Sequence, residues 1–242
     1  SSSYQTLNAM VTKGVFFIEE KEISRIEVYK KDDLISFDLS EEQQKALNQI
    51  QKVFESKEVV LLHGVTSSGK TEIFIKLIKD VISKGKQVLY LLPEIALTTQ
   101  IINRLQKHFG DKIGVYHSKF NNNERGELWS EVLNGNRFPI ILGTRSSIFL
   151  PFQNLGLIVV DEEHEISFKQ KQSSPRYNAR DTAIMYANLL RAKVLLASAT
   201  PSLETYNNAI SQKYGLVTLS TRYGGVKMPK IDIEDIKYVT HR

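Results

Sequence analysis

Apolar residues from position 37 onward fall into short continuous runs, separated by segments in which apolar side chains recur at helical spacing. Continuous runs of about four to eight apolar residues predict strands buried on both faces. The predicted strands are 59–63, 87–92, 112–117, 139–143, 155–160 and 193–197, and the predicted helices are 41–54, 71–83, 97–109, 123–133 and 180–191. This alternation indicates an α/β fold with a mostly parallel sheet covered by helices on both faces.

The first 36 residues follow a different pattern. Residues 2–13 predict a helix that ends at Gly14, and the runs 15–20 and 23–29 predict a hairpin. A helix and one hairpin bury too little apolar surface to be stable alone. We therefore expect this segment to be the edge of a neighbouring domain.

Composition narrows the class of protein without defining a function. The 242 residues are 41% hydrophobic and 24% charged, which is ordinary for a soluble globular protein. No apolar run reaches about 18 residues, so neither a membrane-spanning helix nor a membrane partner is expected. The absence of cysteine excludes disulfides and thiolate metal sites and agrees with a cytoplasmic location. The net charge of +5 and pI of 9.2 permit a nucleic-acid partner.

The octet 64–71 reads GVTSSGKT and fits the G-x-x-x-x-G-K-[ST] phosphate-binding loop. It lies between a predicted strand and a predicted helix, where backbone N–H groups at a helix N-terminus bind anions. Lys70 would contact the β- and γ-phosphates and Thr71 would bind Mg²⁺. The alternative is a Gly-Ser turn that binds nothing. The candidate ATP-binding residues here are Gly64, Thr66, Ser67, Ser68, Gly69, Lys70 and Thr71.

A second candidate site follows the apolar run 155–160, which ends in Asp161, Glu162, Glu163 and His164. Carboxylates directly after a buried strand are costly unless a charged partner compensates them. A bound magnesium nucleotide would be such a partner. Asp161 would hold the cation, and Glu162 would orient and deprotonate the attacking water. The alternative is an acidic first turn of a helix, which the helix dipole also favours.

The polar ends of two further segments each have two interpretations. Ser198 and Thr200 follow the last predicted strand and would sense the γ-phosphate, whereas Thr200 before Pro201 also fits a helix N-cap. Gln43 fits a capping box with Ser40, and its amide also suits the edge of adenine. From spacing alone, the cap is the better interpretation of Gln43.

Taken together, these motifs resemble those of superfamily 2 helicases, and most closely the PriA-type replication-restart helicases of bacteria (primosomal protein N′). The resemblance covers residues 37–230 and includes a DEAH-like box at 161–164. Its most specific part is FKQ at 168–170 followed by PRYNARD at 175–181, which resembles the aromatic-rich loop of that family. The other matching stretches are 39–43, 64–72, 91–100, 115–118, 143–149 and 198–202.

The resemblance implies roles for individual residues. Gln43 becomes an adenine reader, and His164, Ser198 and Thr200 would couple the nucleotide state to DNA. Hydroxyl and guanidinium groups along the predicted DNA track suit phosphate oxygens, and aromatic residues stack on bases of any sequence. The DNA-binding residues that it implies are Thr98, Gln100, Arg104, Thr144, Arg145, Phe168, Lys169, Arg176, Tyr177 and Arg180. An ordinary surface loop with a buried tyrosine is the alternative for 168–181.

Two positions depart from the family pattern. Ser67 stands where glycine is usual, and if the backbone there needs a positive φ, serine costs about 1 kcal/mol. Asn178 stands where histidine is common, which leaves its role in the loop open.

The resemblance also implies an organisation into domains. Residues 1–36 would be the end of a winged-helix DNA-binding domain with a linker, 37–230 a RecA-like ATP-binding lobe, and 231–242 a connector. PriA-type helicases have a second lobe with an arginine finger and a cysteine-rich zinc insertion. We therefore expect the chain to be a piece of a longer protein, with zinc only in the part that follows.

The activity implied is that of an ATP- and Mg²⁺-dependent 3′→5′ DNA helicase in replication restart and primosome assembly at stalled forks. The expected partners are single-stranded and forked DNA, the single-strand-binding protein and the loaders of the replicative helicase, with the helicase itself a monomer. The isolated lobe is expected to bind nucleotide weakly and to turn it over little.

Three alternatives to this activity remain. They are another superfamily 2 DNA translocase, a P-loop kinase acting on a small molecule, and a non-catalytic DNA-binding scaffold. A kinase gives no role to Glu162, His164 or the aromatic-rich loop, and intact Lys70 and Asp161 argue against a vestigial site.

Overall fold

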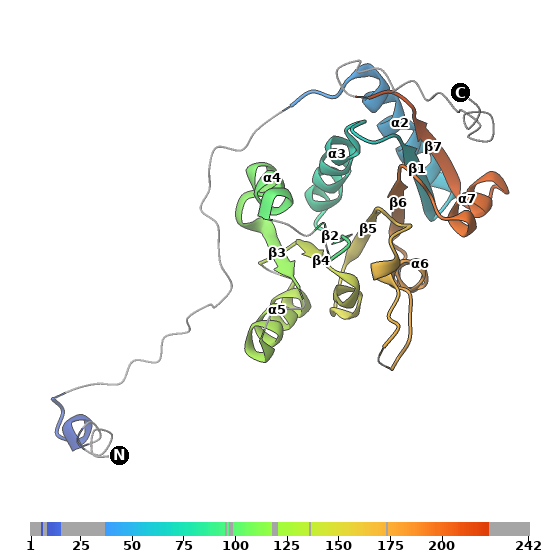
Figure 1. The fold of residues 1–242 in the computed structure, drawn as a ribbon. Coiled ribbons are helices and arrows are strands. Elements are labelled where there is room, and N and C mark those ends of the chain that lie inside the picture. Colours follow the sequence, from blue (N-terminus) through green and yellow to red (C-terminus); the bar gives the residue numbers. More distant parts are fainter. Residues whose placement is uncertain are drawn as a thin grey trace, which may run out of the picture.

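The computed structural model describes residues 6, 9–15, 37–94, 96, 99–117, 121–135, 137–172 and 174–222. These residues contain a seven-stranded sheet with the order β3-β4-β2-β5-β6-β1-β7 (Figure 1). Every neighbouring pair of strands is parallel. The strands are β1 (Val59–Gly64), β2 (Gln87–Leu91), β3 (Ile113–Tyr116), β4 (Ile140–Gly143), β5 (Leu155–Asp161), β6 (Lys193–Ser198) and β7 (Gly215–Leu219).

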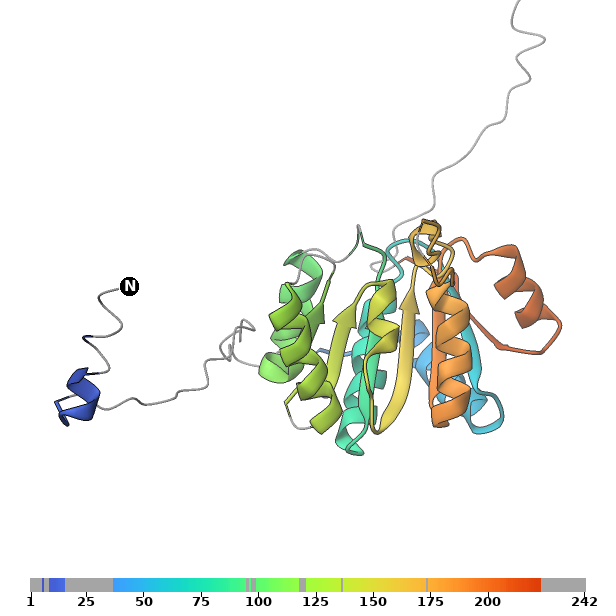
Figure 2. The same ribbon diagram turned by 90° about the horizontal axis from the view of Figure 1, so that it is seen from below.

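Helices cover both faces of the sheet, as the sequence predicts. Figure 1 shows α2, α3 and α4 on one face and α5, α6 and α7 on the other, and Figure 2 looks onto the second face. The helices are α2 (Glu41–Ser56), α3 (Lys70–Ser83), α4 (Thr99–Phe109), α5 (Asn122–Asn134), α6 (Ala179–Leu190) and α7 (Leu203–Ile210), with the short 3-10 helices η1 (Gly110–Lys112), η2 (Arg145–Phe149) and η3 (Ile166–Phe168).

Two apolar clusters fill the space between the sheet and these helices. The first contains Ile50 from α2, Phe74 from α3 and Leu105 from α4, packed on one face of the strands. The second contains residues of α5, α6 and α7, among them Leu128 and Ala183, on the other face. Because both faces are buried, the central strands are continuously apolar, which explains the runs in the sequence.

The parallel arrangement brings the ends of distant segments together. The carboxyl ends of all strands lie at one edge of the sheet, at the top of Figure 2. The register places Asp161 opposite Ala197 and His63 opposite Ser198. Loops that follow β1, β2, β4, β5 and β6 therefore start from the same edge, which is where open α/β sheets bind ligands.

All predicted strands and helices from residue 37 onward are present, with small shifts at their ends. The helix α7 and the strand β7 were not predicted, nor were the three short 3-10 helices. Helix α7 leaves Leu203, Tyr206 and Ile210 exposed, and β7 is an edge strand with Leu216 exposed, so neither shows a continuous apolar run. Within the described part of the chain, no helix is both long and apolar enough to cross a bilayer.

The N-terminal predictions are only partly covered by the described residues. Residues 9–12 are helical, and Gly14 has a φ of 69°, which suits a residue that ends a helix. The predicted hairpin beyond Val15 and the predicted connector 231–242 lie outside the described residues.

A candidate nucleotide site and an adjacent nucleic-acid surface

The phosphate-binding loop joins β1 to α3, as predicted. Gly69 is the N-cap of α3 with a φ of 78°, and no side chain caps the helix. Its N-terminal N–H groups are thus available to an anion. Ser67 has a φ of 59°, so the positive φ considered for this position is present and the serine is strained. Lys70 Nζ donates a hydrogen bond to the Gly64 carbonyl over 3.0 Å.

The Gln43 side chain makes two sets of hydrogen bonds that stabilise the local structure. Its Oε1 accepts from the Ser40 N–H at 2.9 Å and the Ser40 hydroxyl accepts from the Gln43 N–H, so the capping box is confirmed. Its Nε2 donates to the carbonyls of Ser68 and Gly69, each at 3.3 Å. The side chain is 1% exposed, so reading adenine requires the amide to leave these partners. The adenine role stays a prediction.

Gly69 has no room for a side chain. A Cβ at Gly69 would lie 2.1 Å from Gln43 Nε2, and the positive φ would add strain. The positive φ therefore requires this second glycine of the motif, and a Cβ would also displace the Gln43 amide from its two carbonyl partners.

Asp161 ends β5 and receives a hydrogen bond from a residue that the sequence analysis did not single out. Tyr90, buried in β2, donates its hydroxyl to Asp161 Oδ2 over 3.0 Å. Burial and then repulsion from Glu162 raise the pKa of Asp161 from 3.8 to about 6. Burial and the neighbouring Asp161 also raise the pKa of Tyr90 well above 10.0, which keeps Tyr90 protonated as a donor. The site thus holds the ionised form of Asp161 at an electrostatic cost.

Glu162 adopts a strained backbone conformation, with a φ of 47°. Its N–H donates to Asp161 Oδ1 over 3.1 Å, which holds the Asp161 carboxylate against the backbone of Glu162. Strain of this kind at a non-glycine residue is concentrated at functional sites.

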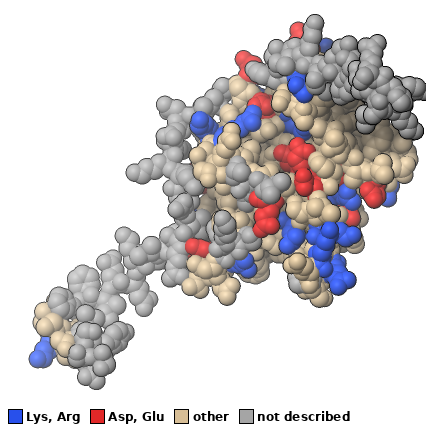
Figure 3. All heavy atoms as spheres, viewed as in Figure 1, with Lys and Arg blue, Asp and Glu red and all other residues tan. Residues whose placement is uncertain are grey.

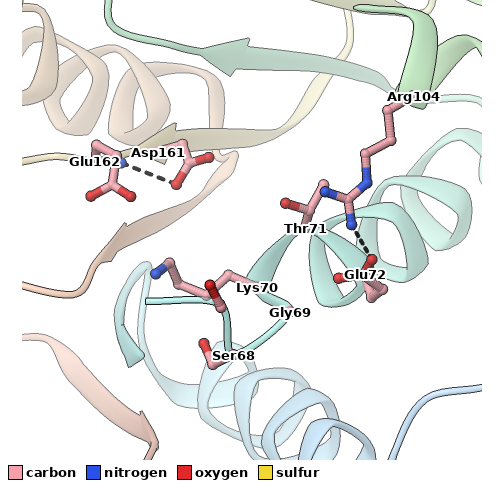
Figure 4. Close-up of a pocket in the computed structure, with 9 residues that line it drawn as sticks. Ser68, Gly69, Lys70, Thr71, Glu72, Arg104, Asp161 and Glu162 are labelled. Carbon is pink, nitrogen blue, oxygen red and sulfur yellow. Dashed lines mark hydrogen bonds and ion pairs between the residues drawn. The ribbon is translucent and has the colours of Figure 1, made fainter. Parts of the chain in front are cut away.

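The phosphate-binding loop and the two carboxylates line one cavity of about 480 Å³. Lys70, Asp161 and Glu162 lie on one side of it, and Arg104 with Glu72 lies on the other (Figure 4). The lining residues are Ser67, Ser68, Gly69, Lys70, Thr71, Glu72, Arg104, Asp161 and Glu162. Gly64 and Thr66 lie outside the lining. The structure thus brings together the predicted phosphate, metal and catalytic residues.

The position of Arg104 on the DNA track stays a prediction, because its side chain is 47% exposed. The Arg104 guanidinium forms an ion pair with Glu72 in the first turn of α3, on the side of the nucleotide cavity opposite the two carboxylates (Figure 4). The opposite charge of Glu72 holds it there, at the wall of the phosphate-binding site.

The predicted coupling residues are linked by hydrogen bonds. His164 Nδ1 lies 2.8 Å from Ser198 Oγ, and the Thr200 N–H donates to the same oxygen over 2.9 Å. Thr200 is not the N-cap of the next helix. Ser202 caps α7 by accepting from the Thr205 N–H, so the capping interpretation of Thr200 was wrong by two residues.

Arg180 does not lie free for DNA. Its guanidinium donates to Glu163 Oε2 at 3.0 Å and to Ser202 Oγ at 2.7 Å. Glu163 is 2% exposed and further accepts from the Ser202 N–H and the Thr205 hydroxyl. The assignment of Arg180 to DNA binding was therefore wrong, because a buried carboxylate holds its charge.

The remaining predicted DNA-binding residues divide into three groups. Phe168 is 1% exposed and belongs to the core, so its assignment as a stacking residue was wrong. Thr144 is 5% exposed, and Arg145 and Tyr177 are partly exposed around a second cavity. The exposed residues are Gln100, Lys169 and Arg176, and Thr98 lies outside the described residues.

Asn178, whose role the sequence left open, caps α6. Its side chain accepts from the Arg180 N–H over 3.0 Å. The aromatic-rich loop therefore ends at a defined helix start, with the isolated bridge between Lys169 and Asn178 closing its base.

Three residues of the site were missed by sequence reasoning: Tyr90, Glu163 and Phe149. Tyr90 is the one polar-tipped residue near the end of an apolar strand, and a buried hydroxyl needs a partner, which was an available signal. Glu163 is the third of three consecutive acids, and nothing in the sequence indicates that it faces inward. Phe149 is 56% exposed beside Tyr177, a contact between segments far apart in the chain.

Comparison with known proteins agrees with this geometry. The chain is 47% identical over 219 residues to the replication restart protein PriA of Rickettsia prowazekii (strain Madrid E), a match that covers 90% of this chain and 33% of that protein. It is 38% identical over 242 residues to PriA of Bacillus subtilis (strain 168), covering 98% of this chain and 30% of that protein. The chain thus spans about a third of the length of these relatives.

Solved structures show a shared fold. RecG bound to a three-way DNA junction superposes with a TM-score of 0.56 at 21% identity, over 80% of this chain and 25% of that chain. The helicase MrfA bound to DNA gives a TM-score of 0.54 at 17% identity, over 76% of this chain and 27% of that chain.

Residues 40–209, well over half of the chain, match the DEAD/DEAH box helicase family. Their span includes the capping box, the phosphate-binding loop, the carboxylates of β5 and the Ser198–Thr200 segment. The protein therefore belongs to the DEAD/DEAH box helicase family.

Proposed function

We propose that the chain is the ATP-binding lobe of a DNA helicase or translocase that acts in replication restart and moves 3′→5′ on DNA. The observation that carries the proposal is the single cavity in which the phosphate-binding loop faces Asp161 and Glu162. The similarity to replication restart proteins named PriA supports the process, and forked DNA is the substrate that we propose.

The residues of the cavity fit a magnesium nucleotide. The uncapped start of α3 offers N–H groups to phosphate oxygens, and Lys70 adds a positive charge. Thr71 and Asp161 would hold Mg²⁺ with oxygen ligands, which this cation prefers. When bound, the cation neutralises negative charge on the phosphates.

Three residues of the chain would have separate roles in ATP hydrolysis. Lys70 exchanges its hydrogen bond with the Gly64 carbonyl for one with a phosphate oxygen. Glu162 orients the attacking water and accepts its proton, while its N–H stays bonded to Asp161. Tyr90 keeps Asp161 oriented, since its raised pKa leaves the hydroxyl protonated at any working pH.

A route from the nucleotide to the proposed DNA surface follows from the contacts of His164. Its ring lies 2.8 Å from Ser198 Oγ and 3.7 Å from Glu162 Oε2. If Glu162 moves when the γ-phosphate is lost, His164 would shift with it and change the hydrogen bonds of Ser198. Ser198 Oγ also accepts from the Thr200 N–H, so the position of Thr200 would change as well. We propose that this chain of contacts couples hydrolysis to DNA.

The site assignment is tested by nucleotide binding to the chain and to Lys70→Ala, with Mg²⁺ and with or without forked DNA. We expect Lys70→Ala to weaken ATP binding by about tenfold or more, because a charge-assisted hydrogen bond to phosphate is lost. Lys84→Ala is the matched control, since Lys84 lies at the opposite end of α3 and pairs with Asp80 on the surface. Unchanged ATP affinity in Lys70→Ala would exclude the assignment.

A further inference from the structure

Residues 198–200, which follow β6, are contacted by a second histidine besides His164. His63 is the penultimate residue of β1 and directly precedes Gly64, the first residue of the phosphate-binding loop. The Nε2 atom of His63 lies 3.2 Å from the carbonyl oxygen of Ala199. Because a carbonyl oxygen only accepts, Nε2 carries the proton and His63 is the donor.

This hydrogen bond extends the link between β1 and β6 beyond the end of the sheet. In the register of the two strands, the last pair is His63 with Ser198. Ala199 lies one residue past that pair, so strand pairing no longer positions it. The side chain of His63 therefore holds Ala199 next to the start of the phosphate-binding loop.

The ring of His63 also contacts α7. It lies 5.9 Å from the ring of Tyr206, with an angle of 82° between the two planes, which is an edge-to-face contact. Helix α7 is in turn joined to the acidic segment after β5, because the Ser202 N–H and the Thr205 hydroxyl both donate to Glu163. A shift of the His63 ring would thus reach both Ala199 and α7.

The backbone beside His63 changes its contacts when Lys70 binds a phosphate. Lys70 Nζ donates to the Gly64 carbonyl over 3.0 Å, and the Val65 N–H of the same peptide group donates to the Leu219 carbonyl over 3.1 Å. The Lys70 side chain also packs on this backbone, since a Cβ at Gly64 would lie 3.1 Å from Lys70 Cδ. When Lys70 turns to a phosphate oxygen, the Gly64 carbonyl loses its donor, and the adjacent His63 can move with it.

Two histidines therefore reach residues 198–200 from the two halves of the nucleotide site. His164 comes from the acidic segment and lies 2.8 Å from Ser198 Oγ. Figure 3 shows acidic side chains gathered near the middle of the face that carries the strand ends. His63 comes from the phosphate-binding loop and binds Ala199. A phosphate-binding loop is occupied by ADP and ATP alike, whereas the acidic side acts on the γ-phosphate and the attacking water, so the two contacts respond to different parts of the nucleotide.

We propose that His63 is a positioning residue that transmits occupancy of the phosphate-binding loop to Ala199, while His164 transmits the presence of the γ-phosphate to Ser198. The inference rests on the proposed function, since it supposes that Lys70 binds a phosphate. His63 does not line the nucleotide cavity, so it acts through the backbone of Gly64 and not by touching the nucleotide. Residues 198–200 then differ between the empty, the ADP-bound and the ATP-bound site.

The test follows the backbone amide of Thr200 by two-dimensional NMR of the isotope-labelled chain. The Thr200 N–H donates to Ser198 Oγ, so its chemical shift depends on the geometry of residues 198–200. Spectra are recorded without nucleotide, at saturation with magnesium ADP, and at saturation with magnesium adenylyl imidodiphosphate, a non-hydrolysable analogue of ATP. We expect ADP to shift the Thr200 signal of the unchanged chain and the analogue to shift it further.

Two substitutions of His63 separate its hydrogen bond from its packing. His63→Phe keeps a ring against Tyr206 and removes the N–H donor, whereas His63→Gln keeps an N–H at about the same reach and removes the ring. We expect His63→Phe to lose the shift caused by ADP and to keep the further shift caused by the analogue, and His63→Gln to keep both. His164→Ala should show the reverse of His63→Phe. The affinity of His63→Phe for ADP should change by less than about tenfold, because one neutral hydrogen bond away from the ligand is lost.

The outcomes distinguish this inference from the proposed function. If the unchanged chain binds ADP and the Thr200 signal does not shift, the role of His63 is overturned and the nucleotide site stands. The same conclusion follows if the ADP shift survives in His63→Phe or is lost in His63→Gln. Failure of the unchanged chain to bind magnesium ADP would overturn the proposed nucleotide site and the role of His63 with it.

Discussion

Asp161 illustrates how a functional residue can destabilise the fold that carries it. Its carboxylate is held in a partly closed site beside Glu162, and its pKa is raised from 3.8 to about 6. A raised carboxyl pKa means that the folded chain favours the neutral form. Above about pH 6 the ionised group therefore costs stability, and the cost falls as the pH drops through 6 toward the value of the unfolded chain.

We expect Asp161→Asn to stabilise the chain in the absence of nucleotide. At pH 8 the free energy of unfolding should rise by about 1–3 kcal/mol, because the charge is gone. The single asparagine oxygen still accepts from Tyr90, whereas the Glu162 N–H loses its acceptor, which reduces the gain. The gain should shrink to about a third at pH 4.5. Urea unfolding at both pH values measures it, with the exposed Asp111→Asn as control. A gain that is the same at both pH values would show that charge is not its cause.

The carboxylate of Glu72 also places negative charge in the nucleotide cavity, where it opposes phosphate binding. Glu72 places a carboxylate in the first turn of α3, and its Oε2 is buried without a hydrogen-bond partner in the described part of the structure. A negative charge in the wall of a phosphate cavity repels the ligand. Arg104 compensates by pairing with the other oxygen of Glu72.

Removal of Arg104 should therefore weaken nucleotide binding through Glu72. We expect Arg104→Ala to lower the affinity for magnesium ADP by about tenfold, measured by titration calorimetry. Glu72→Gln in the Arg104→Ala background should restore most of the loss, because the repulsive charge is then absent. If the two changes are instead additive, Arg104 contacts the nucleotide directly and the compensation by Glu72 is wrong.

At the scale of the elements, the buried side chain of Glu163 connects the end of β5 to the starts of α6 and α7. It follows β5, pairs with Arg180 at the start of α6 and accepts from Ser202 and Thr205 of α7. The side chain of Arg180 is 11% exposed and that of Glu163 is fully buried, so loss of either partner leaves a charge without compensation.

Arg180→Met should lower the free energy of unfolding by about 3–5 kcal/mol, because Glu163 is left as an unpaired buried charge. Combining it with Glu163→Gln should recover about 1–2 kcal/mol, since glutamine keeps an acceptor for Ser202 and Thr205. Asp181→Asn is the control. It removes the other carboxylate bonded to Arg180, which is 59% exposed, and should cost less than about 1 kcal/mol. Denaturant unfolding compares all variants, and an intact stability in Arg180→Met would contradict the role of the pair.

The elements differ in how well their sequences predict them. Strands β2 and β5 are buried on both faces, so their continuous apolar runs predict them directly. The edge strand β7 alternates between buried and exposed positions over five residues, too short a signal to separate from a loop. Helix α7 has eight residues and keeps several apolar side chains in solvent, so its pattern lacks one apolar face.

At the scale of the whole molecule, the sequence predicts those parts of the site whose functional residues lie next to one another in a single short segment. The phosphate-binding loop and the Asp161–Glu162 step are local motifs, and the parallel sheet brings them to one edge. Contacts between distant segments are not contained in such motifs. The pairing of Arg104 with Glu72, the burial of Phe168 and the approach of Phe149 to Tyr177 depend on how helices and loops pack, so the sequence did not predict them.

Turnover by this chain alone should be slow even where nucleotide binding is retained. Of the described residues that line the nucleotide cavity, only Lys70 and Arg104 are cationic, and Arg104 is paired with Glu72. Charge that develops on the γ-phosphate is thus stabilised by Lys70 and Mg²⁺ with little further positive charge, and a missing arginine in such sites costs about 10³–10⁵ in rate. We expect magnesium ADP to raise the melting temperature of the chain, while steady-state hydrolysis stays near that of Glu162→Gln, which keeps the cavity and lacks the base. Robust ATPase activity that is stimulated by DNA and lost in Glu162→Gln would contradict this expectation and show that the chain's own residues complete the site.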